Sequence, residues 1–257
     1  DFCLSRGLGD VYKRQMYHED GTFFKPHFFT HPAAHAFIDT QIIAAAPYRY
    51  LWAGIGDTYA KNYEAEISSR GEKLPHYTEV GVGFSKMCLT PMLEYGRQAL
   101  EDNKKGVATE ALEQVVLAIV VTTAIVSIFL TRDFTPDYNS GLAHACFYAL
   151  TAYPVIEKEH LHGEVVGFGV LYALLVDGQQ EEFEKIYALN KELGLPVRIA
   201  DIGITEEQFF ETMDRIPQMS DIRHYPYAVT KEMLMQAYET IEPVSYTHLR
   251  AHETGRN

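Results

Sequence analysis

Apolar residues recur at helical spacing through most of the chain, from residue 48 to residue 243. Residues three and four apart share one face of a helix, and segments with the alternation of a strand are nearly absent from this region. The pattern predicts a mainly α-helical domain with helices at Asp57–Ser69, Phe84–Asn103, Ala108–Leu130, Ser140–Tyr153, Gly163–Asp177, Gln180–Leu193, Thr205–Arg215 and Thr230–Thr240.

Residues 16–47 have a different pattern, of α/β character. Asp20 and Gly21 lie between two short runs with aromatic residues, a strong signal for a β-hairpin with a two-residue turn. Asp39 provides an N-cap for a short helix that ends before Pro47. We therefore expect a small α/β segment before the helical domain.

The two ends of the chain show neither pattern. Residues 1–15 and 244–257 stop abruptly where the patterned sequence begins. Both strings resemble the translated sequencing-adapter ends that occur on genes from short-read assemblies, and disordered termini are the alternative. We treat both as non-native tails and expect that Met16 is not a true start and that the natural protein continues upstream.

One apolar stretch raises the question of a membrane span. Val115–Leu130 contains only apolar residues, threonine and serine, but its 16 residues fall short of the roughly 20 that a spanning helix needs. Glu110 and Glu113 precede it, and Arg132 and Asp133 follow, so it has no consistent basic flank. We expect instead a helix buried on all sides within the helical domain.

Charge and cysteine content narrow the classes of partner. The 257 residues include 22 Lys and Arg against 35 Asp and Glu, a net charge of -13. Such a surface repels phosphate backbones and anionic lipids, so we expect neither nucleic acid nor a membrane as partner. The three cysteines, Cys3, Cys88 and Cys146, form no CxxC pair, which fits a reducing cytoplasm. We expect Cys88 and Cys146 to be small core residues.

Three side chains in apolar surroundings could ligate a metal: Asp57, His144 and His162. One carboxylate and two neutral imidazoles suit a divalent ion that keeps a position open for substrate. Each residue also has an ordinary explanation. Asp57 could be a helix N-cap, His144 a hydrogen-bonded core residue and His162 a solvated loop residue, with His160 as a competing ligand. No GxSxG elbow, P-loop or strand-borne GxGxxG fingerprint offers a competing chemistry.

Together these segments resemble the glycerol dehydrogenase branch of the iron-containing, metal-dependent alcohol dehydrogenases. The resemblance rests on AGIGD ending at Asp57, the aromatic-Glu-Ala sequence Tyr63–Ala65, GLAHA around His144 and HGEVVGFG beginning at His162. It extends over roughly residues 16–243. It implies that Asp57, His144 and His162 are the metal ligands, which leaves His160 out.

The resemblance also implies a fold and a reaction. The fold is dehydroquinate synthase-like: residues 16–47 would be a remnant of an N-terminal nucleotide-binding domain, and residues 48–243 the helical metal-binding domain. The reaction is hydride transfer between a polyol or small alcohol and NAD or NADP, with a divalent metal, zinc in preference to iron. A cytoplasmic homo-oligomer, and a truncated chain that is inactive alone, are further expectations.

Two alternatives remain. An enzyme of the dehydroquinate synthase or glycerol-1-phosphate dehydrogenase type shares the fold but needs cationic side chains for a phosphate. Only Lys61 and Lys158 are basic around the three ligand segments. A non-catalytic helical module, with both histidines as core residues, is the second alternative. Tyr148 stands where many relatives place another polar residue, which leaves the substrate open.

Overall fold

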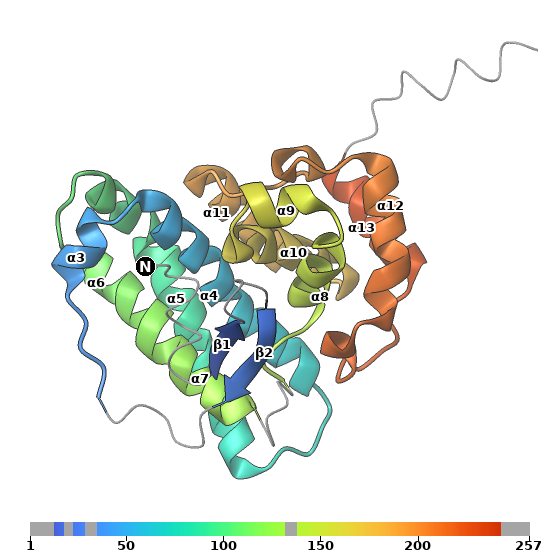
Figure 1. Ribbon diagram of the computed structural model, residues 1–257. Helices are drawn as coiled ribbons and strands as arrows, with labels where there is room; N and C mark the ends of the chain where they lie inside the picture. Colours follow the sequence, from blue (N-terminus) through green and yellow to red (C-terminus); the bar gives the residue numbers. More distant parts are fainter. Residues whose placement is uncertain (1–12, 18–22, 29–34, 132–137, 243–257) are drawn as a thin grey trace, which may run out of the picture.

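The computed structural model describes residues 13–17, 23–28, 35–131 and 138–242. A two-stranded antiparallel sheet precedes a body of helices (Figure 1). The strands and first helices are β1 (Lys13–Tyr17), β2 (Phe23–Phe28), α3 (Thr40–Ala45), α4 (Tyr48–Ser69), α5 (His76–Lys104), α6 (Glu110–Leu117), the π-helical turn η1 (Ala118–Thr122) and α7 (Thr123–Leu130). The remaining elements are α8 (Leu142–Leu150), α9 (Pro154–Glu159), α10 (His162–Val176), α11 (Gln180–Leu193), α12 (Glu206–Arg215), α13 (Lys231–Ile241) and the short 3-10 turns η2 (Ile199–Ile202), η3 (Ile216–Gln218) and η4 (Ser220–Ile222).

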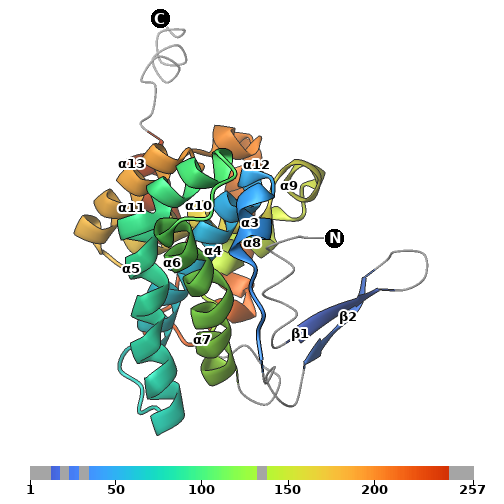
Figure 2. The same cartoon turned by 90° about the vertical axis from the view of Figure 1, so that its left-hand side faces the viewer.

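Helix α4 runs through the middle of the helical body. It packs against α5 on one side and against α10 on another, and α8 lies against α10. Helices α6 and α7 follow α5, whereas α12 and α13 cover α8 and α10. The hairpin of β1 and β2 stands beside this body (Figure 2). The centre of the domain is therefore the junction of α4, α8 and α10.

Glycines bring the backbones of α4 and α10 into direct contact. A Cβ atom on Gly56 would lie 2.3 Å from the carbonyl oxygen of Gly163, and a Cβ on Gly163 would lie 2.0 Å from that of Ala53. On Gly167 it would lie 2.6 Å from the hydroxyl of Tyr59. No larger residue fits at these positions unless the helices separate.

Several predicted elements are confirmed. Helix α11 has the predicted bounds, and Gly194 ends it with a φ of 75°, in the left-handed region that favours glycine. The predicted hairpin is present as β1 and β2, while its Asp20-Gly21 turn lies outside the described residues. Strand β1 begins at Lys13, inside the segment that we assigned to a tail. The assignment of both tails stays a prediction.

Two predicted helix starts are wrong. Helix α4 begins at Tyr48, so Asp57 lies in mid-helix and is not the N-cap of a new helix. Helix α5 begins at His76 and not at Phe84. Each true start directly follows a proline, whereas low-propensity glycines inside the helices made the prediction begin too late. In α4, Gly56 serves contact with α10 and Gly54 packs against Ile119 of η1, and neither forms a turn.

The prediction that the long apolar helix is buried on all sides is wrong, because one of its faces is partly exposed. The predicted Ala108–Leu130 helix is divided by the turn η1 into α6 and α7. Leu117 and Ile125 remain 38% and 37% exposed, because only one side of the helix packs against α5. Residues Glu110–Leu130 are long and apolar enough to cross a membrane, yet half of this stretch is buried, as in a core helix.

Candidate metal centre

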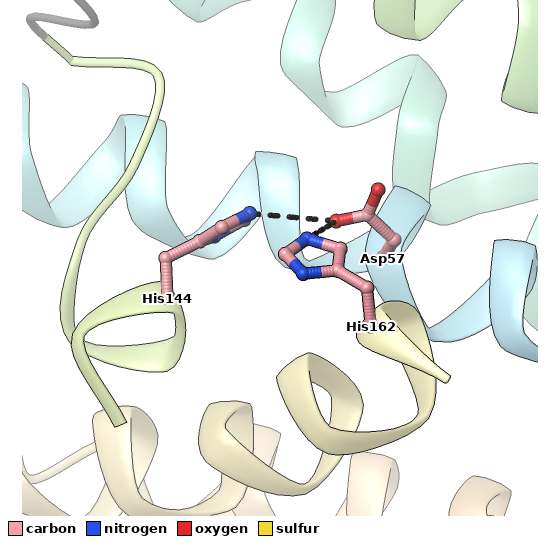
Figure 3. A group of neighbouring side chains, drawn as sticks. All are labelled: Asp57, His144 and His162. Atoms are coloured by element: carbon pink, nitrogen blue, oxygen red, sulfur yellow. Dashed lines mark ion pairs between the residues drawn. The ribbon is translucent and has the colours of Figure 1, made fainter. Parts of the chain in front are cut away.

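The junction of the three central helices brings together the three predicted ligands. Asp57 comes from α4, His144 from α8 and His162 from the first turn of α10 (Figure 3). The Oδ1 atom of Asp57 lies 3.5 Å from Nε2 of His144 and 3.6 Å from Nε2 of His162. One possible ligand atom from each residue lies within 4.8 Å of the others. This is the one such group of three or more that the described residues form.

The glycine contacts explain why distant segments of the sequence meet here. Gly56 directly precedes Asp57, and Gly163 directly follows His162. Because these two glycines touch across the helix crossing, the side chains beside them converge. A Cβ on Gly163 would also lie 2.9 Å from the Cβ of Asp57. The small residues of both motifs therefore bring the ligands within reach of one ion.

The geometry and donor types fit a divalent cation. Oδ1 of Asp57 is buried and carries no hydrogen bond, and its 3.5 and 3.6 Å separations from the rings are longer than a good hydrogen bond. Ligands held at 2.0–2.2 Å in a tetrahedron are about 3.4 Å apart, close to these separations. A buried carboxylate oxygen that carries no hydrogen bond and faces two imidazole nitrogens suits a divalent ion such as zinc or iron.

Glu64 is a buried neighbour of the site to which the sequence analysis gave no role. Its Oε2 lies 2.7 Å from Nδ1 of His144. Its Oε1 accepts hydrogen bonds from the backbone N–H groups of Gly141, at 2.8 Å, and His144, at 2.9 Å. Glu64 follows Asp57 by seven residues, about two helical turns, so both lie on one face of α4. The predicted helix Asp57–Ser69 already contained both residues, so this spacing could have indicated Glu64.

Lys61 adds a buried cation to the same face of α4. It lies four residues after Asp57 and three before Glu64, and its Nζ donates a 2.7 Å hydrogen bond to the carbonyl oxygen of Asn139. Its charge helps to keep both carboxyl groups ionised. Lys158, the other basic residue considered for a phosphate, lies exposed on α9.

The charges at the centre shift the pKa values of its members. Burial alone would raise the pKa of Asp57, but the rings of His144 and His162 outweigh it and hold that pKa well below the ordinary range. Burial disfavours a charged His144, yet the Glu64 carboxylate raises the pKa of that ring to about 9. Burial lowers the pKa of His162. Because a ligating imidazole must offer a free lone pair, a cation at this site would compete with a proton for His144.

The contacts of neighbouring side chains show why His162 lies in the cluster and His160 does not. His160 does not join the cluster, because its Nδ1 lies 2.7 Å from Oε1 of Glu164. Phe147 packs edge-on against His162, with ring centroids 4.4 Å apart. Tyr148 is 43% exposed, and its ring centroid lies 6.2 Å from that of His144. The structure thus brings His162, and not His160, to Asp57.

The two cysteines in the described part of the chain are confirmed as small core residues. Both are buried, and Sγ of Cys88 lies 3.8 Å from the hydroxyl of Thr123. Burial raises the pKa of the Cys88 thiol to about 12 and that of Cys146 further still. Neither thiol is a reactive nucleophile at neutral pH.

Known proteins similar in sequence include several glycerol dehydrogenases. The enzyme of Thermotoga maritima is 30% identical over 232 residues, which make up 84% of this chain and 60% of that protein. The enzyme of Pseudomonas putida is 32% identical over 198 residues, 75% of this chain and 52% of that protein. The chain thus spans between half and two thirds of the length of these relatives. No family model matches it.

Solved structures agree on the fold. Glycerol dehydrogenase of Schizosaccharomyces pombe matches with a TM-score of 0.75 and 22% identity, over 99% of this chain and 65% of that one. An iron-containing alcohol dehydrogenase of Thermotoga maritima matches with a TM-score of 0.54 and 17% identity, over 93% of this chain and 61% of that one. The chain is therefore a relative of the glycerol dehydrogenases that has the helical-domain fold of the iron-containing alcohol dehydrogenases.

Proposed function

We propose that this chain is the metal-binding part of an oxidoreductase of the glycerol dehydrogenase type, which transfers hydride between a polyol or small alcohol and NAD or NADP. The observation that supports this most is the convergence of Asp57, His144 and His162, with a buried Asp57 oxygen that lacks a hydrogen bond. The similarity to glycerol dehydrogenases points to the same reaction class. Zinc is the proposed ion, in preference to iron, because it accepts this set in catalytic sites that keep one position open.

The ion, when bound, would act as a Lewis acid that lowers the pKa of a substrate hydroxyl. The side chains of the chain prepare this site. Asp57 supplies negative charge beside the cation, and the His144 and His162 rings offer nitrogen lone pairs from two other helices. The rings of Phe147 and His162 pack at an interplanar angle of 85°, which limits rotation of the His162 ring. The apolar core beneath α8 and α10 excludes water from the far side of the centre.

The rest of the proposal concerns the whole enzyme. Residues 16–47 would belong to a nucleotide-binding domain, residues 48–243 to the metal-binding domain, and the ends to tails of foreign origin. The enzyme would be a cytoplasmic homo-oligomer without nucleic acid or membrane partners. The net charge of -13 supports the last two points, since it disfavours anionic partners.

A spectroscopic titration tests the substrate class on the chain itself. Cobalt(II) replaces zinc in such sites and has visible bands that report on its ligands. We expect glycerol to shift these bands in the cobalt-loaded parent, and to have no effect on an Asp57→Ala, His144→Ala, His162→Ala triple variant. A shift with glycerol 1-phosphate, but not with glycerol, would favour the phosphorylated-substrate alternative. A parent that binds cobalt but responds to neither compound would contradict the proposed substrate class.

A further inference from the structure

We propose that Glu64 is a positioning residue that holds His144 in the tautomer with a proton on Nδ1, so that Nε2 faces the metal position. This inference rests on the proposed metal site, because it concerns how one ligand of that site is prepared. Glu64 itself does not face the cluster atom of Asp57. It acts through the opposite edge of the His144 ring.

The contact between Glu64 and the ring defines which nitrogen carries the proton. An ionised carboxylate can only accept hydrogen bonds, so across the 2.7 Å contact Nδ1 of His144 must donate. A neutral ring with a proton on Nδ1 has its lone pair on Nε2. That atom lies 3.5 Å from Oδ1 of Asp57, on the side of the candidate centre. The Glu64 carboxylate therefore determines that Nδ1 of His144 carries the proton and that Nε2 is free to bind the metal.

The same carboxylate is fixed relative to the helix that carries His144. Oε1 of Glu64 accepts the backbone N–H groups of Gly141 and His144, at the start of α8. No side chain of α8 caps its own N-terminus, and Glu64 from α4 takes that place together with the hydroxyl of Tyr225, which accepts the N–H of Leu142 at 3.0 Å. A Cβ on Gly141 would come within 3.2 Å of Cγ of Glu64. The Glu64 carboxylate therefore contacts both the backbone and the ring of His144, and so sets the position and the orientation of that residue.

A second glutamate offers a control with similar contacts to a histidine outside the cluster. Oε1 of Glu164 lies 2.7 Å from Nδ1 of His160, and its Oε2 accepts the backbone N–H of Leu161 at 3.0 Å. Glu164 is also buried. Both glutamates therefore combine a histidine contact with a helix cap, but only the partner of Glu64 belongs to the cluster.

The decisive variant is Glu64→Gln. The glutamine oxygen can still accept both N–H groups of α8, but its amide nitrogen faces Nδ1 of His144 as a donor. The ring then accepts at Nδ1 and carries its proton on Nε2, where it blocks the metal. We expect the zinc dissociation constant, measured by competition with a chromogenic chelator, to rise about 10- to 100-fold. Glu164→Gln should stay within about threefold of the parent.

Equal zinc affinity in the parent and Glu64→Gln would overturn the proposal. An equal loss of zinc affinity in Glu64→Gln and Glu164→Gln would overturn it as well. If the Glu64→Gln chain does not fold, nitrogen-15 NMR of the parent can test the proposal instead, by identifying which ring nitrogen of His144 carries the proton. Above the pKa of His144, with His144→Gln to assign its signal, we expect the Nδ1–H tautomer, and the Nε2–H tautomer would contradict the role. A parent that binds no zinc would contradict the proposed function. The tautomer of His144, measured by NMR, would still test the role of Glu64.

Discussion

Two stretches of this chain are almost equally apolar, yet they behave differently. Helix α10 is buried along its whole length apart from His162 and Leu175, and it lies between α4 and α8. The stretch Glu110–Leu130 is longer, but half of it is buried, and Leu117 and Ile125 face outward. Hydropathy therefore does not determine which of the two forms the centre of the domain.

The difference lies in the small residues. Helix α10 carries glycines at 163, 167 and 169, where a Cβ would meet the backbone or a hydroxyl of α4 or α8 at 2.0–2.6 Å. The stretch Glu110–Leu130 contains no glycine and packs through its side chains. Backbone contact on two sides buries nearly all of α10, and it also places His162 beside Asp57. In this fold, close helix approach and ligand convergence have the same cause.

The largest expected effect contrasts two leucines. Leu171 in α10 is fully buried, whereas Leu117 in α6 is 38% exposed. We expect Leu171→Ala to lower the free energy of unfolding by about 3 kcal/mol, because it leaves a cavity, and Leu117→Ala to lower it by less than about 1 kcal/mol. Urea denaturation of both variants measures this. Similar losses in the two would show that the two stretches are equally buried.

A smaller effect contrasts two glycines. In Gly163→Ala the new Cβ would lie 2.0 Å from the carbonyl oxygen of Ala53, so α10 must move away from α4. We expect a loss of about 2–3 kcal/mol in unfolding free energy, together with weaker zinc binding. Gly83 in α5 is the matched control, since a Cβ there meets nothing within 4 Å. Gly83→Ala should stabilise the chain by up to about 1 kcal/mol. Unchanged stability of Gly163→Ala would refute the proposed helix contact.

The smallest effect concerns the far end of the same helix pair. Asp177, which follows α10, accepts two hydrogen bonds from Arg70, which follows α4, and one from Tyr227. Burial of Asp177 is outweighed by these partners, and its pKa lies below the ordinary value. Its stabilisation is therefore present above the unfolded-state pKa and is lost as pH falls through the lower, folded-state pKa.

We expect Asp177→Asn to cost about 2 kcal/mol at pH 7, as measured by urea denaturation. The difference from the parent should shrink as pH falls below about 4. A difference that stays constant from pH 7 to pH 3 would show that the charge of Asp177 does not clamp the two helices together.

The sequence predicted the helical class, the bounds of α11 and the three residues that the structure brings together. Helical spacing and local caps involve neighbouring residues and predicted the helices, whereas the three ligand residues followed from the resemblance to the glycerol dehydrogenases. The sequence pattern placed Asp57 at a helix start because Gly54 and Gly56 favour a turn locally. Gly56 instead contacts Gly163 of α10, more than a hundred positions away, and Gly54 contacts Ile119 of η1. Glu64 was missed for the same reason, since its partners at Gly141 and His144 are distant in sequence.

The central claim is that the contact of α4 with α10 builds a metal site from Asp57, His144 and His162. Zinc content of the purified chain tests it most directly, with single alanine variants of these three residues and His160→Ala as control. We expect about one zinc per chain in the parent and in His160→Ala, and a large loss of bound zinc in each ligand variant. A well-folded parent without zinc, or ligand variants that retain it, would contradict the account.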